Sequence, residues 1–406
     1  MPAKANYLAM TSSPIQTSSF DVAVIGGGPA GLTAAIALGS AGARTALIAR
    51  RAPYADNRTT ALLGGSVELL ERLDVWARCA DQSAPLEVMR LVDDTKRLIR
   101  APEVKFRAVD IGRDAFGHNI ENHVLMAALE ARASELPQLT RFDADADGIT
   151  PADDGVAVTT RTGETLKAAL VVGADGRQSL CREAAGISVT QHRLPQSALT
   201  FTVTHSRPHK NVSTEFHTAQ GPCVFVPLPG DRCSVVWVAA PDEAERLMAL
   251  DDAALSAAVE TQAHHILGRM TVQPGRHLFP LSIERPQAFA RNRIVLVGEA
   301  AHVLPPIGAQ GLNMGLRDAS DLAGIVASAV AAGDDIGAPA VLARYARARR
   351  GDVMSRTAVI DIANRSLLSD LLPMQFARAI GLRLIDAIGP LKRLAMREGL
   401  APSWRS

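Results

Sequence analysis

Three glycines near the start of the chain, Gly26, Gly28 and Gly31, have the spacing GxGxxG. They follow a short β-branched segment, residues 20–25, and open an alanine-rich helical pattern. In such a turn the first glycine permits a tight bend, the second lets the backbone approach a pyrophosphate, and the third lets helix and strand pack closely. The helix N-terminus adds free N–H groups and the positive end of its dipole. The motif therefore predicts a dinucleotide site, without choosing between NAD and FAD.

The residues after the second predicted strand, 45–48, bear on the kind of dinucleotide. Such sites usually carry an acidic residue about 20 positions beyond the glycine motif, where it binds the ribose diol. Here the chain has Ala49, Arg50 and Arg51 instead. An arginine at this place accommodates the 2′-phosphate of NADP, so the local sequence leaves NADP open.

Two further glycine-bearing turns follow apolar segments that are typical of buried strands. The first, VVGADGRQSLCR, ends the run at 169–172, and the second, VGEAAHVLPPIGAQGLNMGLRDA, ends the run at 293–297. Each contains a carboxylate, Asp175 in the first and Glu299 in the second. Turns at three strand ends, far apart in the sequence, suit a long cofactor lying across one sheet.

The elements that must position these turns indicate an α/β fold. The opening strand, helix and strand form a βαβ unit, which predicts a parallel sheet. Apolar periodicity predicts helices over 62–76, 119–136 and 310–332, helical stretches near 241–268, a helical tail from Pro339, and strands over 156–160 and 165–172. Between 197 and 240, short β-rich segments separated by Pro, Gly and Asp predict antiparallel strands in a meander and a second domain.

Composition and charge exclude several classes of protein. The chain has 406 residues, 47% of them hydrophobic, so it can bury a large core. Its net charge of +1 encodes no global attraction to nucleic acid. Four cysteines form no CxxC pair and no metal-ligand pattern, so we expect no metal site and a reducing, cytoplasmic compartment. Residues 1–19 lack the apolar core of a secretory signal and indicate a flexible lead-in, and no apolar run reaches the roughly 20 residues of a membrane span.

With these motifs in place, the chain resembles the FAD-dependent aromatic hydroxylases (class A flavin monooxygenases), most closely the ubiquinone-biosynthesis hydroxylase family. The likeness covers nearly the whole chain after the lead-in, including 56–76, 116–129, 213–237 and the turn after 297. It implies a p-hydroxybenzoate-hydroxylase-like fold: a Rossmann-like, parallel-sheet FAD-binding domain, a mostly antiparallel substrate domain and a helical C-terminal region. The expected bounds are 20–190 and 285–335 for the FAD-binding domain, with part of 85–115 left open to the substrate domain, 191–284 for the substrate domain, and 336–406 for the helical region.

The resemblance also implies an activity. The enzyme would hydroxylate the aromatic ring of a polyprenylated phenol in ubiquinone biosynthesis, through a flavin C4a-hydroperoxide formed from O₂. FAD would be the cofactor and NAD(P)H the reductant, unless an electron-donor protein or another ubiquinone-biosynthesis protein serves as partner. Two alternatives stay open: a flavin monooxygenase of a soluble phenol, and a non-oxygenating flavin- or NADP-binding oxidoreductase. The base that would activate the phenol is unassigned.

The resemblance further implies which residues would hold FAD. Arg58 would reach the pyrophosphate, because a guanidinium can hold phosphate oxygens bidentately. Glu299 would bind the ribitol chain, in place of the aspartate more frequent in the family, and Asp175 would contact the region between FAD and the nicotinamide. The start of the helix after 309 would present N–H groups to the N1 and O2 edge of the flavin. The expected cofactor-binding residues are Gly26, Gly28, Gly31, Arg58, Asp175, Gly298, Glu299, Gly311, Leu312 and Asn313, with Pro305, Pro306, Gly308 and Gly311 flanking the reacting ring.

The tail, 376–406, combines basic and apolar residues. Apolar residues recur at helical spacing among six Arg or Lys, at Phe376, Ile380, Leu384, Ile388 and Leu391. This pattern predicts a basic amphipathic helix. One interpretation is a helix packed on its own domain. The other is peripheral contact with the inner, anionic face of a membrane, where a polyprenyl substrate would be found.

Overall fold

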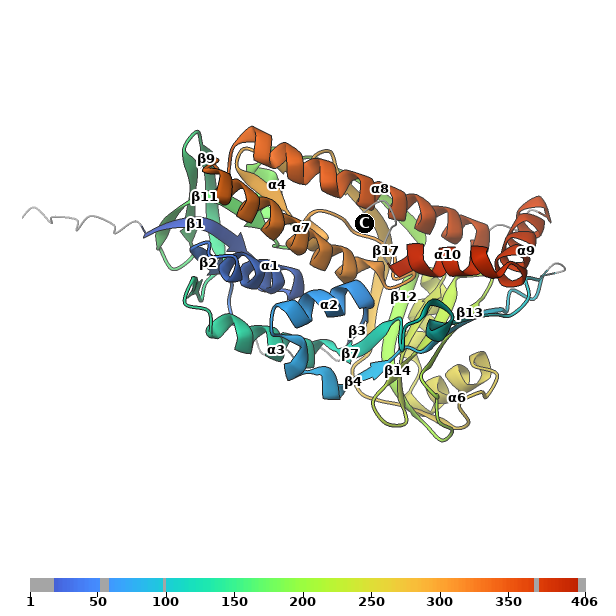
Figure 1. The fold of residues 1–406 in the computed structure, drawn as a ribbon. Coiled ribbons are helices and arrows are strands. Elements are labelled where there is room, and N and C mark those ends of the chain that lie inside the picture. The colour runs from blue at the N-terminus through green and yellow to red at the C-terminus, as the bar shows by residue number, and fades with distance from the viewer. Residues whose placement is uncertain (1–17, 52–57, 98–99, 369–371, 401–406) are drawn as a thin grey trace, which may run out of the picture.

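The computed structural model describes residues 18–51, 58–97, 100–368 and 372–400 (Figure 1). The predicted lead-in lies outside these residues except for Ser18 and Ser19, which belong to the first strand. Two eight-stranded sheets and one three-stranded sheet are packed with helices. In Figure 1 the first sheet lies at the left with its helices and the second lies at the right. Helix α8 runs along the top, and α10 and α9 lie below its right-hand end.

The first sheet confirms the expected parallel arrangement. Its order is β18, β19, β11, β1, β2, β8, with β10 beside β11 and β9 beside β10. The pairs from β19 to β8 are parallel, whereas β18, β10 and β9 pair antiparallel. The strands are β1 Ser18–Ile25, β2 Thr45–Ile48, β8 Leu139–Phe142, β9 Ala146–Ala152, β10 Gly155–Thr160, β11 Thr165–Gly173, β18 Ala290–Arg291 and β19 Ile294–Leu296. Consecutive residues Val22, Ala23 and Val24 are fully buried, as expected for a parallel strand covered on both faces.

The helices of this half bring the predicted turns together. They are α1 Pro29–Ser40, α3 Asn122–Ser134, α4 Leu180–Ala184, α7 Gln310–Ala332 and α8 Pro339–Leu368. α1 packs against both α7 and α3. Small residues permit this approach, because a Cβ on Gly315 would lie only 3.1 Å from that of Ala30. The glycine turn before α1 and the loop before α7 therefore meet at the same edge of the sheet.

The second sheet is mostly antiparallel. Its order is β16, β12, β15, β14, β13, β5, β6, with β17 also paired to β12. The strands are β5 Val88–Asp93, β6 Val104–Arg107, β12 Val189–His205, β13 Val212–His217, β14 Pro222–Leu228, β15 Arg232–Ala239, β16 Met270–Val272 and β17 His277–Pro286. The predicted antiparallel strands are confirmed, and β13, β14 and β15 form a meander. The prediction is wrong for β12, which pairs with β15 instead of β13, while the other edge of β13 pairs in parallel with β5.

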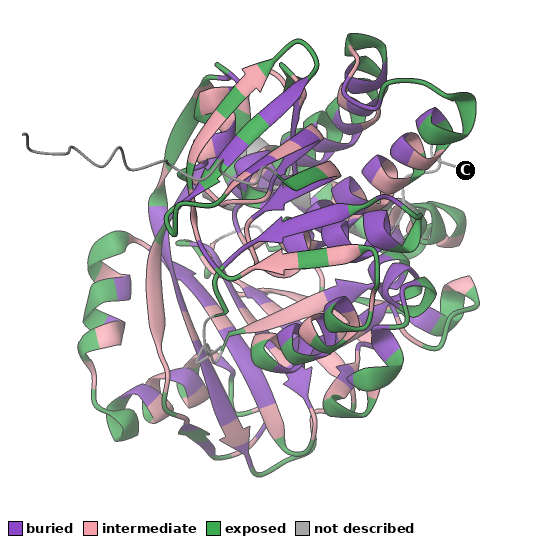
Figure 2. Cartoon of the chain, turned by 90° about the vertical axis from the view of Figure 1, so that its left-hand side faces the viewer, coloured by how far each residue is buried: buried purple, intermediate pink, exposed green. Residues whose placement is uncertain are grey.

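The two faces of this sheet differ in what covers them. Helices α5 Pro241–Ala249 and α6 Asp252–Gln262 cover one face, where Phe216, Phe225 and Val235 form a core with the helices. Because side chains alternate along a strand, the residues between these point to the opposite face. That face turns toward the first sheet and its loops. Figure 2 shows the buried residues concentrated along the strands and the helix surfaces turned toward them.

Two predicted helices begin later than their patterns. Instead of one helix over 62–76 there is a strand, β3 Thr59–Leu63, followed by α2 Gly64–Arg72 and a 3₁₀ turn at Trp76–Arg78. The helix predicted over 119–136 begins at Asn122, because the preceding residues form β7 Gly117–Glu121. β7 pairs antiparallel with β3 and with β4 Ser83–Pro85. Long-range strand pairing therefore overrides the local helical periodicity at both places.

The C-terminal region is helical, with α9 Leu372–Ala387 and α10 Gly389–Leu400 after α8. These two helices pack on the protein through buried Gln375, Ala379 and Met396. Their other side carries six apolar side chains, each 37–54% exposed, which we call the exposed stripe: Phe376, Ile380, Leu384, Ile388, Leu391 and Leu394. Among the residues that the structure describes, no helix combines the length and the apolar character needed to cross a bilayer.

Candidate active site

The glycine turn after β1 leaves its middle glycine open to a ligand. Gly26 has φ +113°, and a Cβ there would lie 2.3 Å from the Ala174 carbonyl oxygen. A Cβ on Gly31 would lie 2.1 Å from the Gly26 carbonyl oxygen. At Gly28, which caps the N-terminus of α1, a Cβ would meet no atom within 4 Å. Close packing therefore explains two of the glycines, and the open face of Gly28 fits a group bound over the turn.

In the turn after β11, the carboxylate of Asp175 forms hydrogen bonds within the turn itself. Asp175 accepts hydrogen bonds from the Ser179 hydroxyl at 2.6 Å and from the Cys181 N–H at 3.0 Å. These bonds shape the turn and the start of α4. Arg177 pairs instead with Glu284 of β17 at 2.8 Å and lines the central cavity described below. Of the three charged residues in this motif, Asp175, Arg177 and Arg182, Arg177 is the one that lines that cavity.

The loop after β19 is anchored by one buried carboxylate. Asp318 of α7 accepts hydrogen bonds from the Gly298 N–H at 2.9 Å and from His302 Nε2 at 2.7 Å. It also pairs with Arg349 of α8 at 2.5 Å. His302 is only 3% exposed, so it supports the loop from within the protein.

Asp318 belongs to a largely buried ion cluster that joins α7 to α8. Its members are His302, Arg317, Asp318, Asp321, Arg349, Asp352 and Arg356. Burial alone would raise the pKa of Asp318, but the charges of Arg349 and His302 outweigh it and hold the pKa below its ordinary value. The pKa of Asp352 is lowered in the same way, since Arg317 and the two other arginines outweigh its burial. Both carboxylates stay charged and fix the position of α7.

The first turn of α7 is tied to its neighbours through side-chain amides. Asn313 is fully buried; its Oδ1 accepts from the Leu63 N–H at 2.8 Å, and its Nδ2 donates to the Ala61 and Ala309 carbonyls at 2.7 and 2.6 Å. Gln310 accepts from Arg356 of the ion cluster at 2.8 Å. The side chain of Asn313 therefore joins β3 to the loop, which leaves its main chain to face a cofactor.

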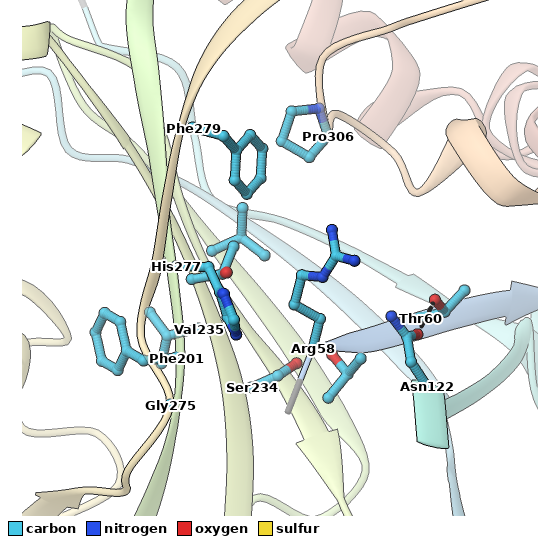
Figure 3. A pocket seen from close by; sticks show the side chains of 13 residues that line it. Arg58, Thr60, Asn122, Phe201, Ser234, Val235, Gly275, His277, Phe279 and Pro306 are labelled. Carbon is cyan, nitrogen blue, oxygen red and sulfur yellow. Dashed lines mark hydrogen bonds between the residues drawn. The ribbon is translucent and has the colours of Figure 1, made fainter. Parts of the chain in front are cut away.

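A cavity of about 470 Å³ lies between this loop, β3 and the open face of the second sheet. We call its two sides the cofactor wall and the sheet wall. The cofactor wall includes Arg58, Glu299, Pro305, Pro306, Gly308, Gly311 and Leu312. The sheet wall includes Ser213, Glu215, Val224, Val226, Ser234, Val236, Phe279 and Leu281. A second pocket of about 220 Å³ overlaps this cavity. In Figure 3 the Arg58 side chain extends into that pocket, with His277 on one side of it and Thr60 on the other.

The structure brings together part of the predicted set. Arg58, Glu299, Pro305, Pro306, Gly308, Gly311 and Leu312 line the one cavity. Gly298 packs against the first turn, where a Cβ would lie 3.0 Å from that of Ala30. The sequence argument assigned no role to individual residues of this side of the site, such as Ser213, Glu215 and His277. The alternation of side chains along residues 212–217 places Ser213 and Glu215 on the same face of a strand. It does not tell which face of the sheet is covered by helices and which faces the cavity.

The open faces of several glycines fit FAD. A Cβ on Gly308 or Gly311, like one on Gly28, would meet no atom within 4 Å. The N-termini of α1 and α7 have no side-chain cap, so their first N–H groups are available to a ligand. The first terminus suits a pyrophosphate and the second suits the electron-rich edge of a flavin ring. These residues therefore fit the cofactor that the sequence motifs imply.

Comparison with known proteins agrees with this geometry. The sequence profile of the family described as FAD binding domain matches residues 19–357. The ubiquinone hydroxylase UbiL of Rhodospirillum rubrum is 34% identical over 387 residues, covering 94% of this chain and 89% of the relative. The 3-demethoxyubiquinol 3-hydroxylase of Escherichia coli is 29% identical, covering 96% of this chain and all (100%) of the relative.

A solved structure shares the fold. The p-nitrophenol 4-monooxygenase PnpA of Pseudomonas putida superimposes with a TM-score of 0.78 over 95% of this chain and 99% of that one. At 20% identity this likeness concerns the fold alone. Taken with the family profile and the relative at 34% identity, it leaves one assignment: the chain belongs to the family of FAD-dependent monooxygenases that includes the ubiquinone hydroxylases.

Proposed function

We propose that this enzyme hydroxylates the aromatic ring of a polyprenylated phenol in ubiquinone biosynthesis. The observation that carries the proposal is that a glycine-rich cofactor wall and a sheet wall lined mainly by apolar side chains face each other across one cavity. An aromatic ring with an apolar chain suits such a wall. The names of the relatives, a ubiquinone hydroxylase and a 3-demethoxyubiquinol 3-hydroxylase, support the same substrate class.

The residues of the chain would position and shield the reaction. When bound, FAD supplies the electrons and the activation of O₂. We assign Arg58 to its pyrophosphate, Glu299 to its ribitol chain, and the N–H groups of Gly311 and Leu312 to the N1 and O2 edge of its ring. Pro305 and Pro306 stiffen the loop that faces the ring, and the sheet wall excludes water from it.

The electron source is the second part of the proposal. No second GxGxxG motif follows a predicted strand, so NAD(P)H would bind at the FAD-binding half or a partner protein would deliver the electrons. Stopped-flow mixing of the FAD-loaded protein with NADPH distinguishes these two sources of electrons. Fast bleaching of the flavin band supports direct reduction, whereas an unreduced flavin favours an electron-donor partner.

Peripheral contact with the inner face of a membrane is the third part. The exposed stripe runs along α9 and α10, and exposed Arg383 and Arg393 stand on the same two helices. Apolar side chains flanked by arginines suit an anionic lipid surface, and a polyprenyl substrate would be dissolved in that membrane. The opposite side of the tail packs on the protein, so the stripe is not needed for the fold.

Vesicle flotation tests the membrane contact. Changing Phe376, Ile380 and Leu384 together to serine should reduce binding to vesicles containing anionic lipid by roughly 100-fold or more, because each buried apolar side chain contributes about 1.5–3 kcal/mol. Val330→Ser is the control, since Val330 is 59% exposed but lies on α7 outside the stripe. Equal flotation of the triple variant and the wild type would contradict the contact.

The lipids of cells with and without the gene test the proposed function. Loss of the gene should lead to a prenylated precursor that lacks one ring hydroxyl, and its mass spectrum would identify the ring carbon. Unchanged ubiquinone and no precursor would contradict the proposal and favour a soluble phenol as substrate.

A further inference from the structure

The sheet wall, which is mainly apolar, carries a carboxylate paired with a histidine. Ser213, Glu215 and His217 alternate along β13 and therefore point to one side of the sheet, opposite the core that contains Phe216. Ser213 and Glu215 line the cavity. His217 Nε2 lies 2.8 Å from Glu215 Oε1. The result is a carboxylate that faces the cavity and is held by a histidine beside it.

Glu215 stands apart from the other carboxylates near the cavity. Among the described residues that line it, the carboxylates are Glu215 and Glu299, and Glu299 stands on the cofactor wall. Glu284 lies behind the wall, where its Oε1 accepts from Arg177 at 2.8 Å, Gln191 at 3.1 Å and Ser282 at 3.1 Å. Glu215 is thus the carboxylate that a ring packed on the sheet wall would meet.

The residues around Glu215 and His217 do not occupy the Glu215 carboxylate, so it can contact a ligand. On β14, apolar Val224 lies opposite Glu215, and on β5 the opposite residue is Leu91. Asp93 of β5, opposite His217, accepts from the Thr95 hydroxyl at 2.7 Å and the Ala101 N–H at 2.8 Å. The following residue, Asp94, forms an ion pair with His264 at 3.2 Å and accepts a hydrogen bond from the Gln262 side chain at 3.1 Å. The acidic groups of β5 therefore have partners of their own.

We propose that Glu215 is the base that accepts the proton of the substrate phenol, and that His217 is a positioning residue for its carboxylate. The assignment rests on the proposed function, because it requires a phenol on the sheet wall. A base must lie within hydrogen-bond reach of the proton, and an oriented partner makes its geometry reproducible. The side chains of Glu215 and His217 are only 18% and 14% exposed, so water competes little for the carboxylate.

The step balances in protons and electrons. The phenol O–H bond breaks, its proton moves to a Glu215 carboxylate oxygen, and the electron pair stays on the phenolate oxygen. The electron-rich ring then takes one atom of O₂, while the reductant supplies the two electrons that convert the other atom to water. The ring carbon then loses its hydrogen as a proton, which passes to the oxygen atom that leaves as water, and aromaticity returns. Glu215 gives its own proton back to the phenolate oxygen. The carboxylate is therefore unchanged over a turnover.

Ligand discrimination tests the contact without turnover. The probes are 2-geranylphenol and its methyl ether, which lacks the donor proton, titrated against the FAD-loaded protein and followed by the flavin absorption band. The wild type should prefer the phenol by roughly 10- to 100-fold, the usual range for a hydrogen bond to a charged group. Glu215→Gln should lose most of this preference and Glu215→Asp should keep part of it. Equal preference in the wild type and Glu215→Gln would overturn the assignment.

The pH profile of hydroxylation tests the proton transfer. Near neutral pH, Glu215→Gln should lower the rate roughly 100- to 10,000-fold. Its rate should then rise about tenfold per pH unit toward the phenol pKa near 10, because only the ionised substrate reacts without the base. His217→Gln should give a smaller loss, roughly tenfold, with the same direction of pH dependence. A loss that is equal at every pH would overturn the assignment.

A matched pair on the helix-covered face provides the control. Glu260 of α6 lies 3.8 Å from His265 and its side chain is 21% exposed, so Glu260→Gln removes a similar carboxylate away from the cavity. It should leave both the preference and the pH profile unchanged. If Glu215→Gln fails to retain FAD, the pH profile of His217→Gln is used to test the assignment instead. Absence of any hydroxylated product with the wild type would overturn the proposed function, and the assignment of Glu215 with it.

Discussion

The two walls of the cavity are built from different forces. The cofactor wall is anchored by charge. Asp318 holds the loop at Gly298 and His302, and behind it Arg349 and Asp352 of α8 pair with Asp318 and Arg317 of α7. The sheet wall is formed by strand pairing, with a helix-covered core on its far face and mainly apolar side chains facing the cavity. We infer that the first wall holds a cofactor in a fixed position, while the second accepts a ring and an apolar chain by shape.

This difference predicts which changes disturb which wall. Charges in a buried cluster depend strongly on one another, because removing one partner leaves the others unpaired in a low-dielectric interior. Apolar contacts on the sheet wall are more nearly independent of each other. Changes in the ion cluster should therefore affect both stability and FAD, and changes on the sheet wall should affect the phenol.

The largest effect is expected from Arg349→Met. Arg349 is fully buried and pairs with Asp318, Asp321 and Asp352. Its loss should lower the free energy of unfolding by about 3–5 kcal/mol and release FAD. Urea unfolding and the flavin content measure both effects. The control Arg344→Met, on an exposed part of the same helix, should stay within about 0.5 kcal/mol of the wild type, and an equal loss in the two variants would contradict the role of the cluster.

Acid should weaken the cofactor wall through the same cluster. The pKa of Asp352 is lower in the folded protein than in the unfolded chain, where it is about 3.9. A depressed folded pKa gives stability that is present above the unfolded pKa and is lost as the pH falls toward the folded value. Between the wild type and Asp352→Asn, the difference in free energy of unfolding should therefore shrink below about pH 4, by about 1.4 kcal/mol per pH unit. A difference independent of pH over this range would argue that Asp352 is not charged.

The smallest of the three effects should come from Gly28→Val. Gly28 has φ −71° and ψ 173°, which any residue adopts, and its open side meets no atom of the chain. The new side chain should occupy the space of the pyrophosphate and weaken FAD binding roughly 30-fold, about 2 kcal/mol, with little change in the stability of the FAD-free protein. Gly324→Val, at an open position on α7, is the control for adding the same side chain. Unchanged FAD affinity would mean that the pyrophosphate lies elsewhere.

The sequence predicted the cofactor wall better than the sheet wall. The turn at Gly26–Gly31 and the helix from Gln310 depend on residues adjacent in the chain, so motif and periodicity locate them. The sheet wall depends on pairings such as β5 with β13, more than 100 residues apart, which no local pattern specifies. For the same reason Leu62 and Leu63 were predicted to begin a helix, although they end strand β3, which pairs with β7. Glu215 acquires its proposed role only when the covered face of its sheet is known.

The contacts inside the turns could not be predicted either. Asp175 and Asn313 were expected to bind the cofactor, and their side chains are engaged with Ser179, Cys181, Leu63 and nearby carbonyls. A carboxylate or amide next to a glycine serves a turn as well as it serves a ligand. Only coordinates distinguish the two uses.

Transfer of oxygen from O₂ to the ring tests the central claim most directly. The FAD-loaded protein is given 2-geranylphenol, NADPH and isotopically labelled O₂, with a generic flavin-reducing system in a parallel sample in case NADPH does not reduce it. The account predicts a product with one added ring hydroxyl that carries the label. Consumption of O₂ with unaltered phenol and only H₂O₂ released, in both samples, would contradict it.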